Sequence, residues 1–181
     1  MKSSQTKPNH HLPEILKPFG LILGHSGQKD VFGLIKNEKG KIIPGDLFDL
    51  HREPTHPNHT WVTGAGLKHF YFFKAVSFEF YKGRLFGLCC IFPSGHDSDS
   101  FEVILYNLEI QYYGVCKRYH NNDCLEETFA IWEYGDTTIE LMFDWKKEEL
   151  FLVYRSESSI QAILKENEKY FREMVLKTSG G

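Results

Sequence analysis

The strongest constraint on the fold is a stretch of alternating side chains, "KAVSFEFYKGRLFGLCCIF", which spans residues 74–92. Apolar side chains at every second position from Val76 to Phe80 have the period of a half-buried strand, because successive side chains point to opposite faces. Lys82 and Gly83 then favour a tight hairpin turn. The following run, residues 85–92, is apolar on both faces, as expected of a central strand. The sequence therefore predicts an antiparallel sheet with a buried centre.

Three later segments alternate in the same way and predict a meander of antiparallel strands. They cover residues 128–134, 138–144 and 150–154, separated by turns that contain "GD" and "WKKE". The aromatic content, 15 Phe, 9 Tyr and 3 Trp, supports a sheet-rich core, because large rings suit a half-buried pleated surface.

Two segments have the helical period instead. Residues 98–113 carry apolar side chains at i, i+3, i+4 and i+7, and Gly114 ends the pattern. Residues 159–177 are predicted as a final helix with Ser156 or Ser158 as its N-cap. Its apolar stripe consists of Ile160, Ile163, Leu164, Phe171, Met174 and Val175.

The N-terminal third is less regular. Residues 1–17 are polar, contain two prolines and are expected to form a flexible tail. Residues 19–23 are predicted as a short strand, and Ser26 as the N-cap of a helix over residues 27–37. Residues 41–68 show no sustained period and are predicted as a long loop.

The predicted element order is β-α-loop-β-β-α-β-β-β-α. Its strands occur in antiparallel runs rather than alternating singly with helices, which is the α+β pattern. We therefore expect one domain over residues 18–178, in which an antiparallel sheet of about five or six strands has helices packed on a face.

Charge and hydropathy limit the classes of partner that we expect. The net charge is −3, so there is no basic excess to neutralise a phosphate backbone, and a nucleic-acid partner is not expected. No stretch approaches the ~20 apolar residues of a membrane span. The location stays open: the cytoplasm is favoured, and export is expected if a signal peptide has been removed.

Cys89 and Cys90 are adjacent in a predicted central strand. Their sulfurs must then point to opposite faces, so the pair cannot bind one metal ion, and an apolar strand raises the pKa of a thiol. Both are interpreted as core residues. Cys116 and Cys124 are candidates for a disulfide only in an oxidising compartment, and otherwise stay free.

The segment "GHDSDS", residues 95–100, has a structural and several functional interpretations. A calcium loop would continue its alternating oxygen ligands to a bidentate acid, an aspartyl phosphotransfer site would start at the strand end, and a phosphate cradle would use free amides. The favoured interpretation is a helix start, with Ser98 or Asp99 as N-cap and Glu102 completing a capping box.

The candidate metal site consists of His51, His56 and His59, with Glu53 as a further ligand or base for zinc. The spacing matches no H-E-x-x-H helix, and the two prolines between the histidines prevent that helix. The alternative is a solvated loop without a ligand, and no cofactor other than zinc is suggested.

Four aromatic residues are candidates for a binding surface, because Tyr and Trp are enriched at interface hot spots. They are Tyr112, Tyr113, Trp132 and Trp145. The alternative is that they pack beneath the helices, as aromatic side chains on a sheet commonly do.

Two stretches resemble known bacterial proteins. "FGLILGHSGQKDVFGLI", residues 19–35, resembles the strand, turn and helix that open BamE-like (SmpA/OmlA) outer-membrane-assembly lipoproteins and beta-lactamase-inhibitor-like repeats. "FEVILYNLEIQYYG", residues 101–114, is similar to helices of uncharacterised exported bacterial proteins, and the element order is similar to that of type III secretion chaperones. These resemblances imply a bacterial, non-catalytic protein-binding role.

The leading hypothesis is a non-enzymatic protein-binding domain, chaperone-like or inhibitor-like, with another protein as its partner. The alternative is a metal-dependent hydrolase that uses the three histidines. A third hypothesis, a ligand held between sheet and helices, requires a deep pocket.

Overall fold

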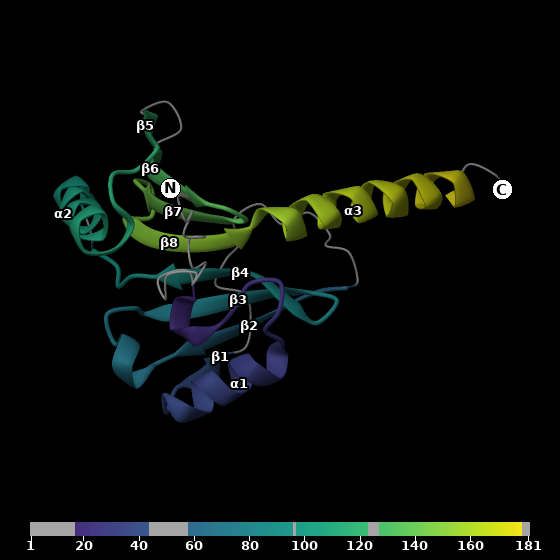
Figure 1. Ribbon diagram of the computed structural model, residues 1–181, viewed down its shortest axis with the longest axis horizontal. Helices are drawn as coiled ribbons and strands as arrows, with labels where there is room; N and C mark the ends of the chain where they lie inside the picture. Colours follow the sequence, from purple (N-terminus) through teal and green to yellow (C-terminus); the bar gives the residue numbers. More distant parts are fainter. Residues whose placement is uncertain (1–16, 44–57, 96, 123–126, 179–181) are drawn as a thin grey trace, which may run out of the picture.

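The computed structural model describes residues 17–43, 58–95, 97–122 and 127–178. In these residues the chain forms an α+β fold in which one open antiparallel sheet of eight strands is accompanied by three α-helices (Figure 1). The strand order across the sheet is β1-β2-β3-β4-β8-β7-β6-β5. Among the helices of these ranges, none combines the length and apolar character needed to cross a bilayer.

The described part of the N-terminal half contains one α-helix, four strands and two short 3-10 turns. These are η2 (Pro18–Gly20), α1 (Gln28–Asn37), β1 (Lys41–Ile43), β2 (His59–Ala65), η3 (Lys68–Phe70), β3 (Ala75–Tyr81) and β4 (Arg84–Ile91). The C-terminal half repeats a helix followed by four strands and then adds a long helix. These are α2 (Ser98–Leu108), the π-helical turn η4 (Glu109–Tyr113), β5 (Arg118–Asn122), β6 (Glu127–Tyr134), β7 (Thr137–Asp144), β8 (Glu149–Ser156) and α3 (Glu157–Thr178).

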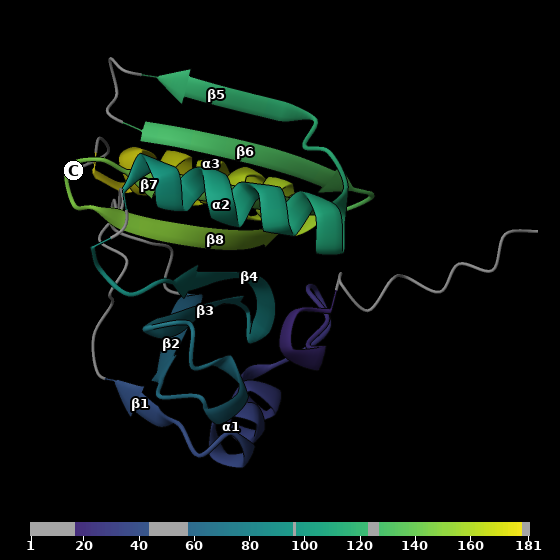
Figure 2. The same ribbon diagram turned by 90° about the vertical axis from the view of Figure 1, so that its left-hand side faces the viewer.

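The two halves join at the centre of the sheet. Strands β4 and β8 pair antiparallel from Gly87 opposite Arg155 to Ile91 opposite Phe151. Each half therefore places its last strand at the junction and its first strand at an outer edge. Figure 2 shows the half with β1–β4 below the half with β5–β8, with α2 beside the upper half.

One contiguous apolar core covers the face of the sheet on which α1 and α2 pack. Val31 and Ile35 of α1 and Phe101 and Leu105 of α2 belong to it. One row of this face crosses five paired strands at Val76, Cys90, Leu152, Leu141 and Ala130. The opposite face carries a smaller buried cluster, which consists of Ala75, Cys89, Ile91, Phe151 and Val153.

The hairpin and the long amphipathic helix are found where the sequence predicts them. Lys82 and Gly83 have φ values of 49° and 74°, so both residues of the β3–β4 turn adopt the left-handed conformation of a type I′ hairpin. The predicted helix over residues 98–113 is the sum of α2 and η4. Ser156 caps α3 as expected, because its Oγ accepts the Ser159 amide at 3.3 Å.

The predicted strand over residues 19–23 is wrong. Its first residues form η2, in which Phe19 has a φ of 58°, a value that strand pairing does not allow. Leu21 is buried all the same. The apolar run therefore reflects burial against the core and not membership of the sheet.

The prediction of a long loop over residues 41–68 is also wrong in part, because β1 and β2 lie within it. Residues 44–57 are outside the described ranges. The strand pattern of β2 is weak because the strand contains Gly64. A Cβ atom at this position would lie 3.0 Å from the Ile35 side chain of α1, so the close approach of the helix favours glycine. Together with β5, which was not predicted, these strands raise the number of strands from the predicted five or six to eight in the described part of the chain.

The start of α2 confirms the structural interpretation of "GHDSDS" but corrects the cap. Asp97 is the N-cap, and its Oδ1 accepts the Ser100 amide at 2.8 Å and the Ser100 hydroxyl at 2.7 Å. Ser98 and Asp99 lie inside the helix, and Ser100 rather than Glu102 completes the capping box. This offset of one or two residues changes which side chain satisfies the free amides at the helix start.

Substitutions of Asp97 and Asp99 should therefore have different effects on the stability of the protein. We expect Asp97→Ala to lower the free energy of unfolding by about 1 kcal/mol, because the Ser100 amide loses its acceptor. The matched variant Asp99→Ala removes an exposed charge in the first turn and should cost clearly less. Urea unfolding followed by circular dichroism measures both, and a larger loss in Asp99→Ala would contradict the assigned cap.

Candidate functional site

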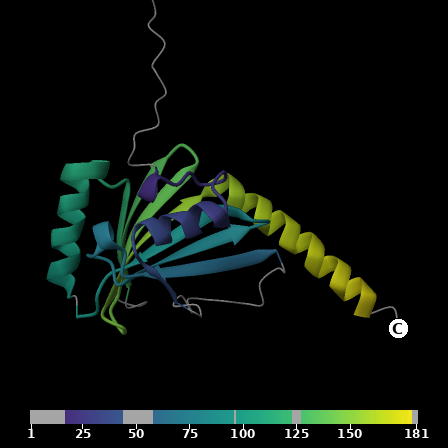
Figure 3. The same ribbon diagram turned by 90° about the horizontal axis from the view of Figure 1, so that it is seen from below.

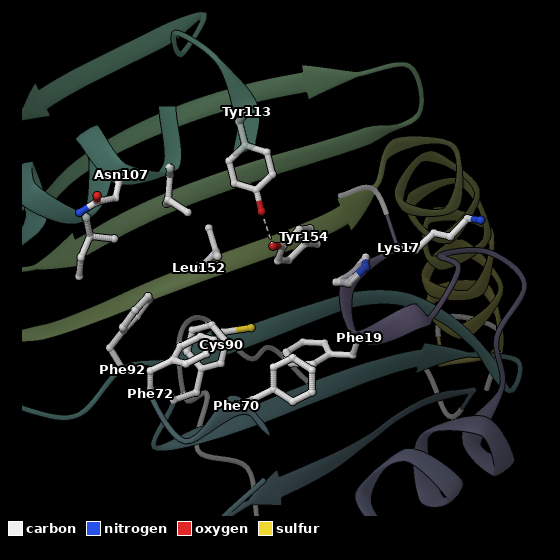
Figure 4. Close-up of a pocket in the computed structure, with 14 residues that line it drawn as sticks. Lys17, Phe19, Phe70, Phe72, Cys90, Phe92, Asn107, Tyr113, Leu152 and Tyr154 are labelled. Atoms are coloured by element: carbon white, nitrogen blue, oxygen red, sulfur yellow. Dashed lines mark hydrogen bonds between the residues drawn. The ribbon is translucent and has the colours of Figure 1, made fainter. Parts of the chain in front are cut away.

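A cavity of about 520 Å³ lies on the helix-covered face, between the two halves of the molecule (Figure 4). Its base is formed at the β4–β8 junction by Cys90, Leu152 and Tyr154. Side chains from α2 and η4 line one side, including Ile104, Leu108 and Tyr113. The N-terminal half supplies an aromatic wall, which consists of Phe19, Phe70, Phe72, Phe73 and Phe92.

The aromatic wall is held together by ring contacts between segments far apart in the sequence. Phe19 packs edge-on against Phe70, with ring centroids 4.4 Å apart, and Phe73 packs edge-on against Phe92 at 5.0 Å. Edge-to-face packing is the geometry that aromatic quadrupoles favour. The positive φ of Phe19 thus places its ring in a preformed cluster at the cavity.

The π-helical turn positions the opposite wall. Tyr113 lies at its end, where the Gly114 amide donates to Glu109 O at 2.9 Å. The indole of Trp132 donates to Gly114 O at 2.8 Å, and the Tyr134 hydroxyl donates to Tyr113 O. Two side chains of β6 therefore bond carbonyls that would otherwise be unsatisfied where this helix ends.

The polar groups of the cavity are few. The hydroxyls of Tyr113 and Tyr154 form a hydrogen bond of 2.5 Å and are buried. The amide of Asn107 donates to Val103 O at 2.8 Å. Lys17 also belongs to the lining, but its side chain extends away from the centre of the cavity in Figure 4.

Few groups of the described cavity lining can take part in proton transfer. Among the described residues that line the cavity there is no histidine and no carboxylate. Cys90 contributes a thiol, but burial raises its pKa well above the ordinary value, so that the thiol stays protonated near neutral pH. A protonated thiol without a base beside it is a poor nucleophile.

The apolar surface continues beyond the mouth of the cavity. Phe72 lines the cavity and is 47% exposed, and its neighbour Tyr71 is 82% exposed. Val103 of α2 and Ile110 of η4 lie one turn before and one turn after Asn107 and are 59% and 63% exposed. We call Tyr71, Phe72, Val103 and Ile110 the apolar rim.

Of the three histidines predicted as a metal site, the structure describes one. His59 lies in β2, where its Nε2 is 3.7 Å from Glu79 Oε2, and its ring packs against those of Trp61 and Phe86. Strand alternation relative to Val62 places it on the face opposite the cavity. His51 and His56, like Glu53, lie outside the described residues. Within the described ranges no three His, Cys, Asp or Glu side chains form a possible metal site, and the three-histidine site stays a prediction.

The cysteine prediction for β4 is confirmed. Cys90 belongs to the main core and lines the cavity, whereas Cys89 belongs to the cluster on the opposite face. Cys116 is partly buried, and its amide donates to Glu109 Oε1 at 2.8 Å. Cys124, its proposed disulfide partner, lies outside the described residues.

The aromatic residues predicted as a surface are only partly brought together. The rings of Tyr113 and Trp132 lie 5.4 Å apart and both are buried. Trp145 lies in the turn between β7 and β8. It packs on Phe143 of β7 and does not line the cavity. Sequence reasoning missed the phenylalanines of "KHFYFF", residues 68–73, although an aromatic run just before a strand was the available signal.

Thiol reactivity provides a test of this geometry. In native protein near pH 8, iodoacetamide should modify Cys116 before Cys89 and Cys90, because burial raises the pKa of both strand thiols well above the ordinary value. Peptide mass spectrometry after timed alkylation measures the order. Both strand cysteines should react once the protein is unfolded in urea. Rapid modification of native Cys90 would show an activated thiol in the cavity.

In comparisons with known proteins, the chain matches no protein-family model, no curated protein and no solved structure.

Proposed function

We propose that the protein is a non-enzymatic protein-binding module, and that its cavity receives apolar side chains of a partner protein. The observation that supports this function is the continuity between the aromatic cavity and the exposed apolar rim. The argument has three steps: the size of the cavity, the chemistry of its walls and the extent of the apolar surface outside it.

The size of the cavity fits an occupant larger than water. Binding pockets of proteins commonly span about 300–1,000 Å³, and the cavity of about 520 Å³ lies within this range. A volume of this kind also exceeds the small voids left by ordinary core packing.

The walls select apolar groups. Five phenylalanines and the aliphatic side chains of Ile104, Leu108 and Leu152 offer dispersion contacts and no charge. Full burial of one Leu or Phe side chain contributes about 1.5–3 kcal/mol, so two or three such side chains supply useful affinity. The hydroxyl pair of Tyr113 and Tyr154 and the Asn107 amide are the polar groups available for orientation.

The apolar rim favours a protein over a small molecule. A small ligand that fills the cavity would leave Tyr71, Val103 and Ile110 in water. A polypeptide that enters the cavity and crosses its mouth would cover them. Exposed apolar and aromatic side chains that adjoin one another are typical of protein interfaces.

Charge substitutions on the apolar rim test the proposal. Peptides selected from a random display library against the protein should be rich in apolar residues, and Phe72→Glu and Ile110→Glu should each weaken their binding at least about tenfold. Ile42→Glu is the matched control, because Ile42 is an exposed apolar residue of β1 outside the cavity lining. Fluorescence polarisation with labelled peptides measures the affinities.

Two outcomes would contradict the proposal. One is peptide binding that neither rim substitution changes. The other is a small molecule found in stoichiometric amount by native mass spectrometry, which peptides fail to displace and which Leu152→Trp excludes from the cavity.

A further inference from the structure

We propose that Glu38, at the end of α1, is a positioning residue that holds part of the aromatic wall in the arrangement that binds a partner. The effect on partner binding rests on the proposed function, whereas the effect of Glu38 on the wall can be measured without any partner. The part concerned consists of residues 68–73, which we call the wall segment.

The wall segment carries much of the binding surface. It contributes Phe70, Phe72 and Phe73 to the cavity lining, and Figure 4 shows the rings of Phe70 and Phe72 at the cavity. Phe72 and the neighbouring Tyr71 are also the two residues of the apolar rim that lie outside α2 and η4. The placement of this segment therefore sets the shape of one wall and of one side of the mouth.

The wall segment begins with a short turn that lacks a cap of its own. This turn is η3 (Lys68–Phe70), and its N-cap residue, Leu67, makes no hydrogen bond with its side chain. The first amides of a helical turn have no acceptor within the turn, and a 3-10 turn of this length has poor hydrogen-bond geometry. An acceptor from another element is needed to fix its direction.

Glu38 provides that acceptor twice. The Lys68 amide donates to Glu38 O at 2.9 Å, and the His69 amide donates to Glu38 Oε2 at 2.9 Å. The ring Nδ1 of His69 lies 3.0 Å from the same carboxylate oxygen. The hydrogen bonds from the His69 amide and ring hold the pKa of Glu38 below its usual value, so the carboxylate is charged at neutral pH. Charged acceptors form the stronger hydrogen bonds.

Glu38 is itself held in place by the end of α1. It is the C-cap residue, and its amide donates to Leu34 O at 2.9 Å. Figure 3 shows α1 lying across the strands of the N-terminal half, where it packs on the core. Gly40 approaches the start of the wall segment so closely that a Cβ atom there would lie 2.6 Å from Leu67 Cδ2. The Glu38 carboxylate therefore meets the wall segment from a fixed position.

Hydrogen exchange of the free protein tests the positioning. Mass spectrometry of peptides that cover residues 68–73 should show exchange at least about tenfold faster in Glu38→Ala, because the His69 amide loses a charged acceptor. Glu38→Gln should restore most of the protection, since its amide oxygen can still accept this bond.

Asp30→Ala is the matched control for these variants. Asp30 is an acid of the same helix whose Oδ2 accepts the Gly27 amide at 2.8 Å, at the end of α1 opposite to Glu38. Its loss should leave exchange in the wall segment unchanged. Equal acceleration in Asp30→Ala and Glu38→Ala would show only a weakened α1 and would overturn the inference.

Fluorescence polarisation with the peptides selected against the wild-type protein tests the consequence for binding. Glu38→Ala should weaken their binding about tenfold, Glu38→Gln should restore it, and Asp30→Ala should leave it unchanged. Unchanged exchange in Glu38→Ala would overturn the inference whatever the peptides do, and so would faster exchange with wild-type peptide affinity. Faster exchange in a protein whose wild type binds no selected peptide would support the positioning of the wall and refute the proposed function instead.

Discussion

The pairing of β4 with β8 is the interaction on which the rest of the structure depends. Among the described strands it is the ladder that joins the two halves, and it runs from Gly87 opposite Arg155 to Ile91 opposite Phe151. A strand in this position must be apolar on both faces, because helices cover one face and the second buried cluster occupies the other. The apolar β4 sequence that includes Cys89 and Cys90 meets that requirement.

The cavity follows from this junction. Helix α1 packs over one half and α2 over the other, and the volume between them is bounded by side chains rather than by a further described helix. Aromatic rings are the largest apolar groups available to line such a gap, and their edge-on contacts hold the gap open. The position of the cavity therefore follows from the placement of the two helices over separate halves of the sheet.

Much of the fold was predictable, and the exceptions have local causes. Strand β7 of the meander and helix α2 have strong periodicity because one face of each is buried, and β4 was recognisable as a continuous apolar run after a turn because both of its faces are buried. The run from Phe19 to Leu23 is equally apolar but does not pair, since its buried side chains pack from a turn. β2 was missed because Gly64 interrupts its pattern where α1 approaches closely. The cavity was considered only as the deep pocket that the third hypothesis, a ligand held between sheet and helices, requires.

The sequence by itself determined the α+β class, the opposite orientations of Cys89 and Cys90 and the amphipathic character of α2 and α3, because these follow from periods within one segment. Only the tertiary structure decided that the β4–β8 junction brings Phe19, Phe72 and Tyr113 around one cavity. These residues come from three separate segments, and their proximity depends on strand order and register. No local pattern records that order, because it is set by which buried faces pack together across the whole sheet.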